Sequence, residues 1–260
     1  MDNLNITLIQ SNLYWEAPKK NREMFQEKIL SVEKPGDIIL LPEMFNTGFS
    51  MNPEKLAETM NGETMEWMTR MSGKTNAVIT GSLIISEENK YYNRLIWMHP
   101  NGSYSHYDKR HLFSLAGEDK VFAAGQHQWI MPIKGWNVFP LICYDLRFPV
   151  WSRRNPQLDY DLIIYVANWP DVRIRAWNHL LIARAIENQS YVAGVNRVGN
   201  DGNEFSHSGN SCVIDYKGEI LSSFEINKEQ HETITLNKDE LADFRKQLPF
   251  SSDADRFEIS

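Results

Sequence analysis

Apolar and polar residues alternate along this chain with two different periods. Leu4, Ile6 and Leu8 are separated by polar residues, a period of two that is typical of a half-buried strand. Residues 17–32 then place their apolar side chains at helical spacing. Residues 38–41, Ile-Ile-Leu-Leu, are apolar on both faces, so this segment is predicted to be a central, buried strand.

The rest of the chain continues to alternate predicted strands with predicted helices. The further strands are rich in β-branched and aromatic residues and cover residues 77–85, 91–98, 103–107, 128–133, 136–142, 161–167, 190–196, 211–215 and 233–236. Helices are predicted at 63–74, at 173–188 and after Asn237, whose side chain can cap the last of them. Turn residues predict hairpins at 100–102 and 215–218. Such an alternation predicts an α/β fold built in layers.

A single domain is expected, because no linker, low-complexity segment or internal repeat interrupts this alternation. The length of 260 residues is enough for one large α/β domain with a complete core. Hydrophobic residues make up 42% of the chain and charged residues 23%, which argues against intrinsic disorder and fibrous architectures. We assign residues 1–250 to this domain and residues 251–260 to a C-terminal tail.

Charge and targeting signals narrow the expected partners and compartment. The 27 Lys and Arg residues against 34 Asp and Glu give a net charge of −7, so no basic surface for nucleic acid or an anionic membrane is expected. No apolar run approaches the ~18 residues of a membrane-spanning helix, and Asp2 stands where a secretory signal would carry positive charge. Cys143 and Cys212 are too few for a disulfide framework. A cytoplasmic protein with free thiols is expected.

Cys143 is the first candidate for chemistry. It follows the apolar strand pattern of residues 138–142 and precedes Tyr144 and Asp145, so its thiol is predicted to lie where a strand leads into a turn. Backbone N–H groups at such a turn lower a thiol pKa and stabilise an oxyanion. The alternative is a structural cysteine, since free cysteines are among the most buried residues.

Three charged residues are further candidates. Glu43 follows the apolar strand at 38–41, at a carboxyl end, where open α/β sheets keep their sites. Lys109 lies in a run of polar and aromatic residues, and Glu118 lies in a polar, glycine-containing segment. Taken singly, each is better explained as a solvated residue of a strand end or a loop. Only their combination with Cys143 suggests a catalytic site.

The four residues lie in motifs that resemble the nitrilase superfamily of carbon–nitrogen hydrolases. Its Glu-Lys-Cys signature has the order found here: Pro-Glu-Met-Phe at 42–45, Tyr-Asp-Lys-Arg-His-Leu-Phe at 107–113 and Leu-Ile-Cys-Tyr-Asp-Leu-Arg-Phe-Pro at 141–149. Other segments look like the omega-amidase branch: Val-Ala-Asn-Trp-Pro at 166–170, Ala-Arg-Ala-Ile-Glu-Asn-Gln at 183–189 and Asn-Arg-Val-Gly at 196–199. The resemblance extends from Ile6 to the strand near Ile234.

The resemblance implies an αββα sandwich that pairs through its helices into a homodimer and uses neither a cofactor nor a metal ion. It implies that Cys143 is the nucleophile, Glu43 the general base, and Lys109 with the backbone N–H of Tyr144 the oxyanion stabilisers. Glu118 matches the second glutamate of the family, which orders the site. An amide is a poor electrophile, so a thiolate formed beside a base and a cation that meets the negative oxygen make chemical sense.

The omega-amidase branch implies a small amide substrate that bears a carboxylate, 2-oxoglutaramate or 2-oxosuccinamate, converted to the 2-oxo dicarboxylate and ammonia. The far carboxylate needs a cation, and Arg147, Arg173 and Arg175 are candidates because a guanidinium matches a carboxylate. Phe113 and Trp169 are candidates for an apolar wall. For these residues, surface ion pairing and ordinary core packing are the alternatives.

Other functions are compatible with the same sequence. A Cys-His hydrolase would use His111, His179 or His207 as its base, although none lies in a cysteine-protease motif. Within the superfamily, an N-carbamoyl amino acid or a nitrile is an alternative substrate. A non-catalytic binding protein on the same fold is the remaining class, because a fold does not fix a function.

Overall fold

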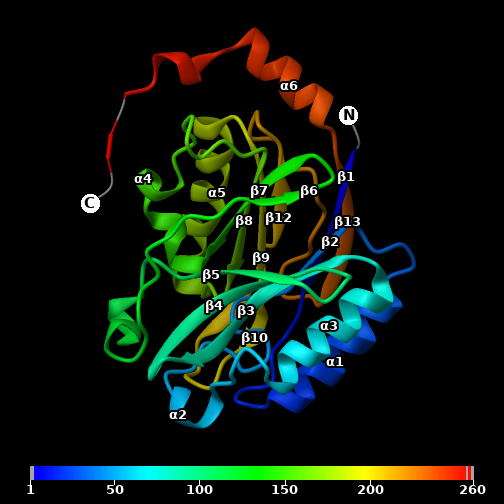
Figure 1. Cartoon of the computed structure of the whole chain (residues 1–260), viewed down its shortest axis with the longest axis vertical. Coiled ribbons are helices and arrows are strands. Elements are labelled where there is room, and N and C mark those ends of the chain that lie inside the picture. The colour runs from blue at the N-terminus through cyan, green and yellow to red at the C-terminus, as the bar shows by residue number, and fades with distance from the viewer. Residues whose placement is uncertain (1–2, 256, 259–260) are drawn as a thin grey trace.

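Two β-sheets form the centre of the computed structural model, which describes residues 3–255 and 257–258 (Figure 1). The first sheet has the order β13-β1-β2-β3-β4-β5 and the second the order β12-β9-β8-β7-β6. The strands of the first sheet are β1 (Leu4–Gln10), β2 (Ile38–Leu40), β3 (Val78–Glu87), β4 (Lys90–Met98), β5 (Tyr104–Asp108) and β13 (Gln230–Leu236). Those of the second are β6 (Met131–Ile133), β7 (Trp136–Ile142), β8 (Leu162–Ala167), β9 (Tyr191–Asn196) and β12 (Cys212–Ile214).

Parallel strands occupy the centre of each sheet, and antiparallel strands flank them. β2 pairs in parallel with β1 and β3, and β8 pairs in parallel with β7 and β9. Parallel pairing places the carboxyl ends of β1, β2 and β3 at one end of the first sheet and those of β7, β8 and β9 at one end of the second. The segments that leave β2, β7 and β8 start at these ends, where open α/β sheets keep their sites.

The strand pattern of the first sheet follows from burial on both faces. Ile6 and Ile38 are register partners and belong to the core between the two sheets. Ile9 and Ile39 point to the opposite face, where they pack in a second core against the helices. This two-sided burial explains why the segment at 38–41 is apolar throughout, and it confirms the prediction of a central, buried strand.

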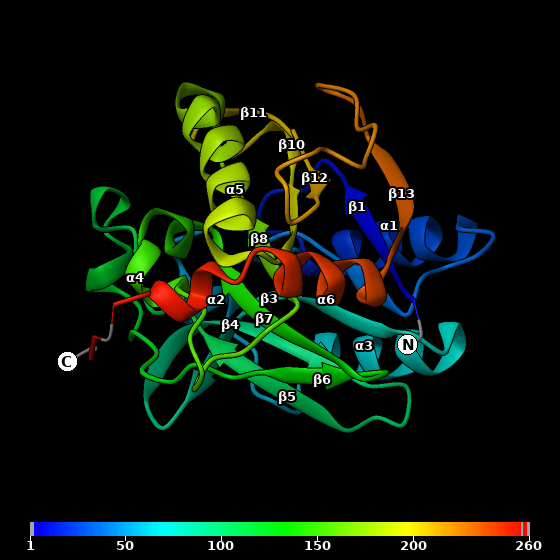
Figure 2. The same ribbon diagram turned by 90° about the horizontal axis from the view of Figure 1, so that it is seen from above.

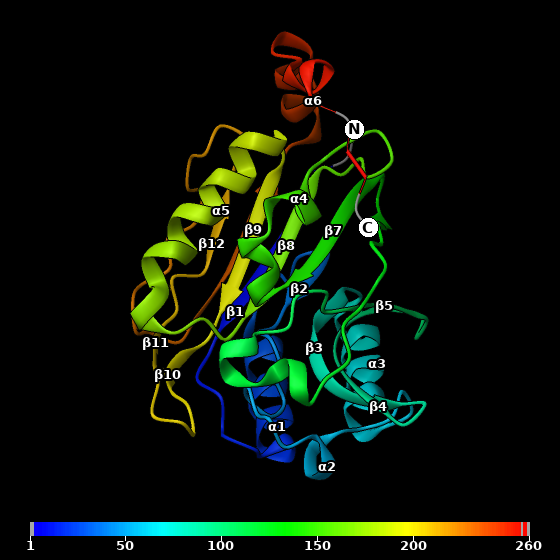
Figure 3. The same ribbon diagram turned by 90° about the vertical axis from the view of Figure 1, so that its left-hand side faces the viewer.

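Helices cover the outer face of each sheet. α1 (Pro18–Ser31) and α3 (Glu63–Thr75) contribute apolar side chains to the core on the first sheet, whereas α5 (Ile174–Asn188) packs on the second (Figure 3). The order helix, sheet, sheet, helix is the predicted αββα sandwich, which is thereby confirmed. α6 (Lys238–Gln247) runs across one end of the molecule instead (Figure 2). Asn237 caps α6 as expected, because its side chain accepts from two N–H groups of the first turn.

Short elements complete the fold. The short α-helices are α2 (Pro53–Leu56) and α4 (Pro149–Ser152), and the 3-10 helices are η1 (Ser114–Ala116), η2 (Glu118–Lys120), η3 (Cys143–Arg147), η4 (Asp171–Arg173) and η5 (Phe250–Asp253). β10 (Val198–Asn200) and β11 (Ser206–Ser208) form a separate hairpin. No helix of the described residues is long and apolar enough to span a membrane.

Several predicted boundaries differ from the structure. The strand predicted at 128–133 contains only Met131–Ile133, an edge strand that carries a proline, and the helix predicted at 173–188 begins at Ile174 after a 3-10 turn. The strand predicted at 211–215 is limited to Cys212–Ile214. Of the predicted tail, residues 256, 259 and 260 lie outside the described residues. The division at residue 250 remains a prediction.

Candidate active site

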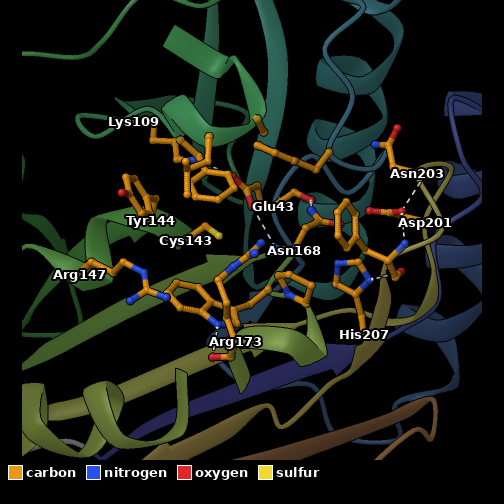
Figure 4. A pocket seen from close by; sticks show the side chains of 17 residues that line it. Glu43, Lys109, Cys143, Tyr144, Arg147, Asn168, Arg173, Asp201, Asn203 and His207 are labelled. Atoms are coloured by element: carbon orange, nitrogen blue, oxygen red, sulfur yellow. Dashed lines mark hydrogen bonds and ion pairs between the residues drawn. The ribbon is translucent and has the colours of Figure 1, made fainter. Parts of the chain in front are cut away.

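Three strand ends bring three of the predicted catalytic residues together, and a fourth strand end adds Asn168 (Figure 4). Glu43 lies three residues beyond β2, Lys109 directly follows β5, and Cys143 directly follows β7. Asn168 directly follows β8. Side chains from both sheets therefore converge on one crevice, although they are far apart in the chain.

Cys143 lies on a tight turn. Its φ of 44° is in the left-handed region, which residues other than glycine adopt at an energetic cost, and it is the first residue of η3. The Asp145 carboxylate holds this turn, because it accepts from the N–H of Ile142 at 3.1 Å and the hydroxyl of Tyr107 at 2.8 Å. The N–H of Tyr144 belongs to the first turn of η3 and has no intrahelical acceptor. The turn thus presents a thiol beside a backbone donor.

Lys109 is buried between two glutamates. Its Nζ lies 2.8 Å from Oε1 of Glu43 and 2.9 Å from Oε2 of Glu118, and all three side chains are removed from solvent. Burial alone would lower the pKa of the Lys109 ammonium, but the carboxylates of Glu118 and Glu43 outweigh it and raise this pKa. Lys109 is therefore protonated although it is buried.

Glu43 connects the cation with the thiol. Its Oε1 accepts from Lys109, and its Oε2 accepts from the N–H of Asn168 at 2.9 Å. The Cys143 thiol lies in the same pocket as the Glu43 side chain. Burial, followed by the charge of Glu43, raises the pKa of Cys143 well above that of a free thiol. The resting thiol therefore keeps its proton, and Glu43 is the acceptor next to it.

Glu118 anchors the other side of Lys109. Its Oε2 accepts from the N–H of Phe113 at 2.6 Å, and its Oε1 accepts from Lys109 at 3.0 Å. Burial raises the pKa of Glu118, and Lys109 opposes this shift. The carboxylate is fixed by the backbone of the segment that precedes η2, so it can hold Lys109 in place.

A pocket with a cavity of about 200 Å³ opens in front of the thiol. It is lined by Glu43, Phe49, Lys109, Phe113, Leu115, Ala116, Cys143, Tyr144, Arg147, Asn168, Trp169, Pro170, Arg173, Asp201, Asn203, Phe205 and His207. Pockets for drug-sized ligands have volumes of about 300–1,000 Å³, so this cavity suits a small metabolite.

Two guanidinium groups lie in the pocket, stacked on aromatic rings. Arg147 lies 4.9 Å from the ring centroid of Trp169, and Arg173 lies 5.0 Å from that of Phe113. Neither of them pairs with a carboxylate of the described residues. Burial, followed by the charge of Arg147, lowers the pKa of Arg173. Two cations without an acidic partner make the pocket attractive to a carboxylate.

The sequence and structure comparisons fit this geometry. A family model described as carbon-nitrogen hydrolase matches residues 5–246 of the chain. The chain belongs to the carbon-nitrogen hydrolase family. The resemblance inferred from the sequence motifs is thereby confirmed.

Relatives of this carbon-nitrogen hydrolase include amidases. The chain is 42% identical to omega-amidase YafV of Yersinia enterocolitica, over 99% of both chains, and 32% identical to 2-oxoglutaramate amidase of Bacillus subtilis, over 84% of this chain and 85% of that one. Among solved structures, a CN-hydrolase superfamily protein from Xanthomonas campestris, with an arsenic adduct in its active site, is 41% identical. Its TM-score is 0.96, and the match covers 100% of both chains.

The histidines of this carbon-nitrogen hydrolase do not form the predicted Cys-His alternative. His111 is bonded to Asp145 through Nδ1 at 2.8 Å, and His179 is exposed on α5. His207 lines the pocket, but its Nδ1 faces backbone carbonyl oxygens, and burial, with the charge of Arg197, lowers its pKa to about 4. The geometry favours Glu43 as the base. Arg175 is exposed on α5 and does not line the pocket, so its candidacy for the substrate carboxylate was wrong.

Several residues of the site were not found from the sequence. Asn168 orients Glu43, and Asn93 of β4 donates to both glutamates, at 2.8 and 3.1 Å. The hairpin of β10 and β11 contributes the far wall of the pocket through residues 201–207. Asn168 had a signal, because it follows a fully apolar strand just as Cys143 does. In the part of the chain that the structure describes, no cluster of three or more His, Cys, Asp or Glu side chains is arranged to hold a metal ion.

Proposed function

We propose that this carbon-nitrogen hydrolase is an omega-amidase that converts 2-oxoglutaramate or 2-oxosuccinamate to the 2-oxo dicarboxylate and ammonia. The observation that carries the proposal is the position of Cys143 and Glu43 in one pocket with the two unpaired guanidinium groups of Arg147 and Arg173. The relatives named omega-amidase and 2-oxoglutaramate amidase, which are similar over most of the chain, support it.

In the first step, Sγ of Cys143 attacks the carbon of the substrate amide, and its proton passes to Glu43. The carbonyl oxygen becomes negative and is stabilised by the N–H of Tyr144 and by Lys109. The Lys109 ammonium donates to Oε1 of Glu43 and to both oxygens of Glu118; the two oxygens of Glu118 can share one N–H, which leaves the third N–H for this oxygen. Glu43 then gives its proton to the nitrogen as the C–N bond breaks. Ammonia leaves, and a thioester on Cys143 remains.

In the second step, water cleaves the thioester. Glu43, again unprotonated, takes a proton from the water, whose oxygen attacks the thioester carbon. The second negative oxygen is stabilised by the same two groups. The carbon–sulfur bond then breaks, the product acid leaves, and Cys143 recovers a proton from Glu43. The resting pKa of the thiol, which burial raises, supports a mechanism in which the base acts at each step.

Arg147 and Arg173 are proposed to select the substrate. A guanidinium donates two parallel hydrogen bonds to a carboxylate, so one arginine takes the carboxylate next to the 2-oxo group. Phe113 and Trp169 support the two guanidiniums by stacking and form the apolar wall. The ammonium of glutamine or asparagine would be placed near these cations, which disfavours the amino acids relative to the 2-oxo amides.

Ammonia release from a panel of amides tests the proposed function. The panel holds 2-oxoglutaramate, 2-oxosuccinamate, glutamine, asparagine, N-carbamoyl amino acids and an aliphatic nitrile. We expect kcat/KM for a 2-oxo amide to exceed that for the matching amino acid at least about 100-fold, because the amino acids would place an unpaired charge in the pocket. A preference for the N-carbamoyl compounds or for the nitrile would overturn the assignment in favour of another activity of the family.

The assembly and the compartment are also proposals. We infer a homodimer that forms through the helices, as the family resemblance implies, and a cytoplasmic location without membrane or nucleic-acid partners. α4 and α5 lie on the same side of the molecule (Figure 3). Val150 of α4 and Ile186 of α5 are 54% and 45% exposed, which supports an apolar contact through these helices.

A further inference from the structure

Asn93 contacts all three charged residues of the site. Its Nδ2 donates to Oε1 of Glu43 at 2.8 Å and to Oε1 of Glu118 at 3.1 Å. Its backbone carbonyl accepts from the N–H of Lys109 at 3.0 Å, across the pair of β4 and β5. The side chain is completely buried and is not among those that line the pocket, so it acts behind the reacting groups.

The orientation of the Asn93 amide is set by the two glutamates. A reversed amide would place its oxygen against two carboxylates, so only the N–H₂ group can face them. Oδ1 then remains buried, and no described group donates to it. An unsatisfied buried acceptor destabilises a protein, whereas an apolar side chain of the same size would fill this space without that penalty. The amide is therefore better explained by its effect on the glutamates than by packing.

Glu43 and Glu118 are two buried carboxylates with a single ammonium between them, and a neutral donor stabilises their charged forms. Glu43 and Glu118 share one ammonium, and all three groups are buried. Burial is the main cause that raises the pKa of Glu118; Lys109 lowers this pKa, and the charge of Glu43 raises it further. A neutral N–H₂ group shared by both carboxylates favours their charged forms without adding a charge of its own. A second ammonium in its place would compete with the first for Glu43.

We propose that Asn93 is a positioning residue that keeps Glu43 and Glu118 charged and bound to Lys109, so that Glu43 can receive the Cys143 proton. The proposal rests on the roles of Glu43 and Cys143 proposed above, but it does not depend on the identity of the amide substrate. It predicts that the pH dependence of Cys143 alkylation changes when Asn93 is replaced, although Asn93 does not line the pocket.

The rate at which iodoacetamide alkylates Cys143, followed against pH by peptide mass spectrometry, tests this role. Asn93→Leu removes the donor at similar size, and Asn93→Asp replaces it by an acceptor. Losing a donor raises the pKa of a carboxylate, so the acid limb of the alkylation profile should move to higher pH, by about one unit in Asn93→Leu and by more in Asn93→Asp. For turnover of the best amide substrate, kcat should fall about tenfold or more, and KM should stay within about twofold.

Asn188→Leu is the matched control. Asn188 is also a buried asparagine with two hydrogen bonds, from the N–H of Arg154 at 2.9 Å and to the carbonyl of Arg184 at 3.0 Å, at the end of α5. The Asn188→Leu variant should have a lower melting temperature than the parent and the same pH dependence of Cys143 alkylation. The proposal is overturned if folded Asn93→Leu or Asn93→Asp keeps the profile of the parent, or if Asn188→Leu shifts it equally. Failure of the 2-oxo amides as substrates would refute the proposed function alone, because alkylation needs no amide.

Discussion

At the scale of single residues, the proposed mechanism depends on proton transfer between the Cys143 thiol and the Glu43 carboxylate. Burial raises the pKa of the thiol, so the sulfur is protonated at rest and becomes nucleophilic only when a neighbour takes the proton. In the proposed mechanism Glu43 is that neighbour, and Lys109 donates to its carboxylate at 2.8 Å. The proposed mechanism therefore depends on the base at both of its steps.

Glu43→Gln should leave the fold intact and remove most of the activity. Glutamine is nearly isosteric and can still accept from the N–H of Asn168, but it cannot take a proton from Cys143 or from water. General base catalysis contributes about 100- to 10,000-fold, so we expect kcat to fall by at least about 100-fold. Steady-state ammonia release, with circular dichroism to verify folding, measures this. Activity within tenfold of the parent would point to a different base.

Lys109→Arg keeps the positive charge and should still be severely impaired. The site holds one compact ammonium between two carboxylates, and a planar guanidinium has neither the size nor the direction of donors that this space requires. Loss of one oxyanion donor costs about 3–4 kcal/mol, or about 100- to 1,000-fold in kcat. The measurement is kcat for the best amide at saturating substrate. An arginine variant that turned over at nearly the parental rate would show that charge alone is needed.

Sequence patterns located the charged centre and missed what orients it. Glu43 and Cys143 follow strands that are visible as apolar runs, so their place at a carboxyl end could be predicted from local sequence. Asn93 and Asn168 are polar residues, and the glutamates to which they donate lie at least 25 residues away in the chain. No periodicity contains such pairings, because they form only when the strands and loops have packed together: Asn93 meets the glutamates within the first sheet, and Asn168 meets Glu43 between the two sheets.

At the scale of elements, the short 3-10 turns carry the two arginines of the pocket, which we propose to bind the substrate. η3 carries Arg147, and η4 ends at Arg173, so two turns from separate strands bring both guanidiniums to one pocket. Strands of six or seven residues around them supply the rigid frame. Substitutions in these turns are therefore expected to change substrate preference, whereas the proposed catalytic residues Glu43, Lys109 and Cys143 follow the ends of strands.

Arg173→Met should weaken substrate binding more than it slows the chemistry. Methionine preserves a flexible stem against Phe113 and removes the cation. A hydrogen bond to a charged group is worth about 1.5–3 kcal/mol, so KM for the 2-oxo amide should rise about 10- to 100-fold with kcat within about fivefold. Arg175→Met, on the exposed face of α5, is the matched control and should leave KM unchanged. An unchanged KM in both variants would leave Arg147 as the carboxylate ligand and contradict the assignment of Arg173.

The elements themselves were predicted unevenly, for reasons of length. β7, β8 and α5 are long enough for their apolar residues to show a period, and their positions agree with the prediction to within a residue or two. β10 and β11 have three residues each, and the 3-10 turns between three and five. At that length a pattern cannot be distinguished from chance, and the backbone is set by contacts such as those of Asp145 with Ile142 and Tyr107.

At the scale of the whole molecule, a dimer through the helices is expected to protect exposed apolar side chains. Val150→Glu combined with Ile186→Glu would place charges on the surfaces of α4 and α5 and should shift the protein to a monomer. Light scattering coupled to size-exclusion chromatography measures the mass of parent and variant. A parent that is monomeric at micromolar concentration, or a variant that stays dimeric, would contradict this interface.

The central claim is that Cys143 carries the acyl group of a 2-oxo amide during turnover. The most direct test is peptide mapping by mass spectrometry of enzyme that is acid-quenched while it hydrolyses saturating 2-oxoglutaramate. Cys143→Ala and Cys212→Ala are its controls, since Cys212 lies in β12, outside the pocket, and burial raises its pKa to about 12. We predict an acyl adduct on the peptide that contains Cys143, no turnover by Cys143→Ala, and turnover by Cys212→Ala. An adduct on any other residue, or ammonia release by Cys143→Ala, would contradict the account.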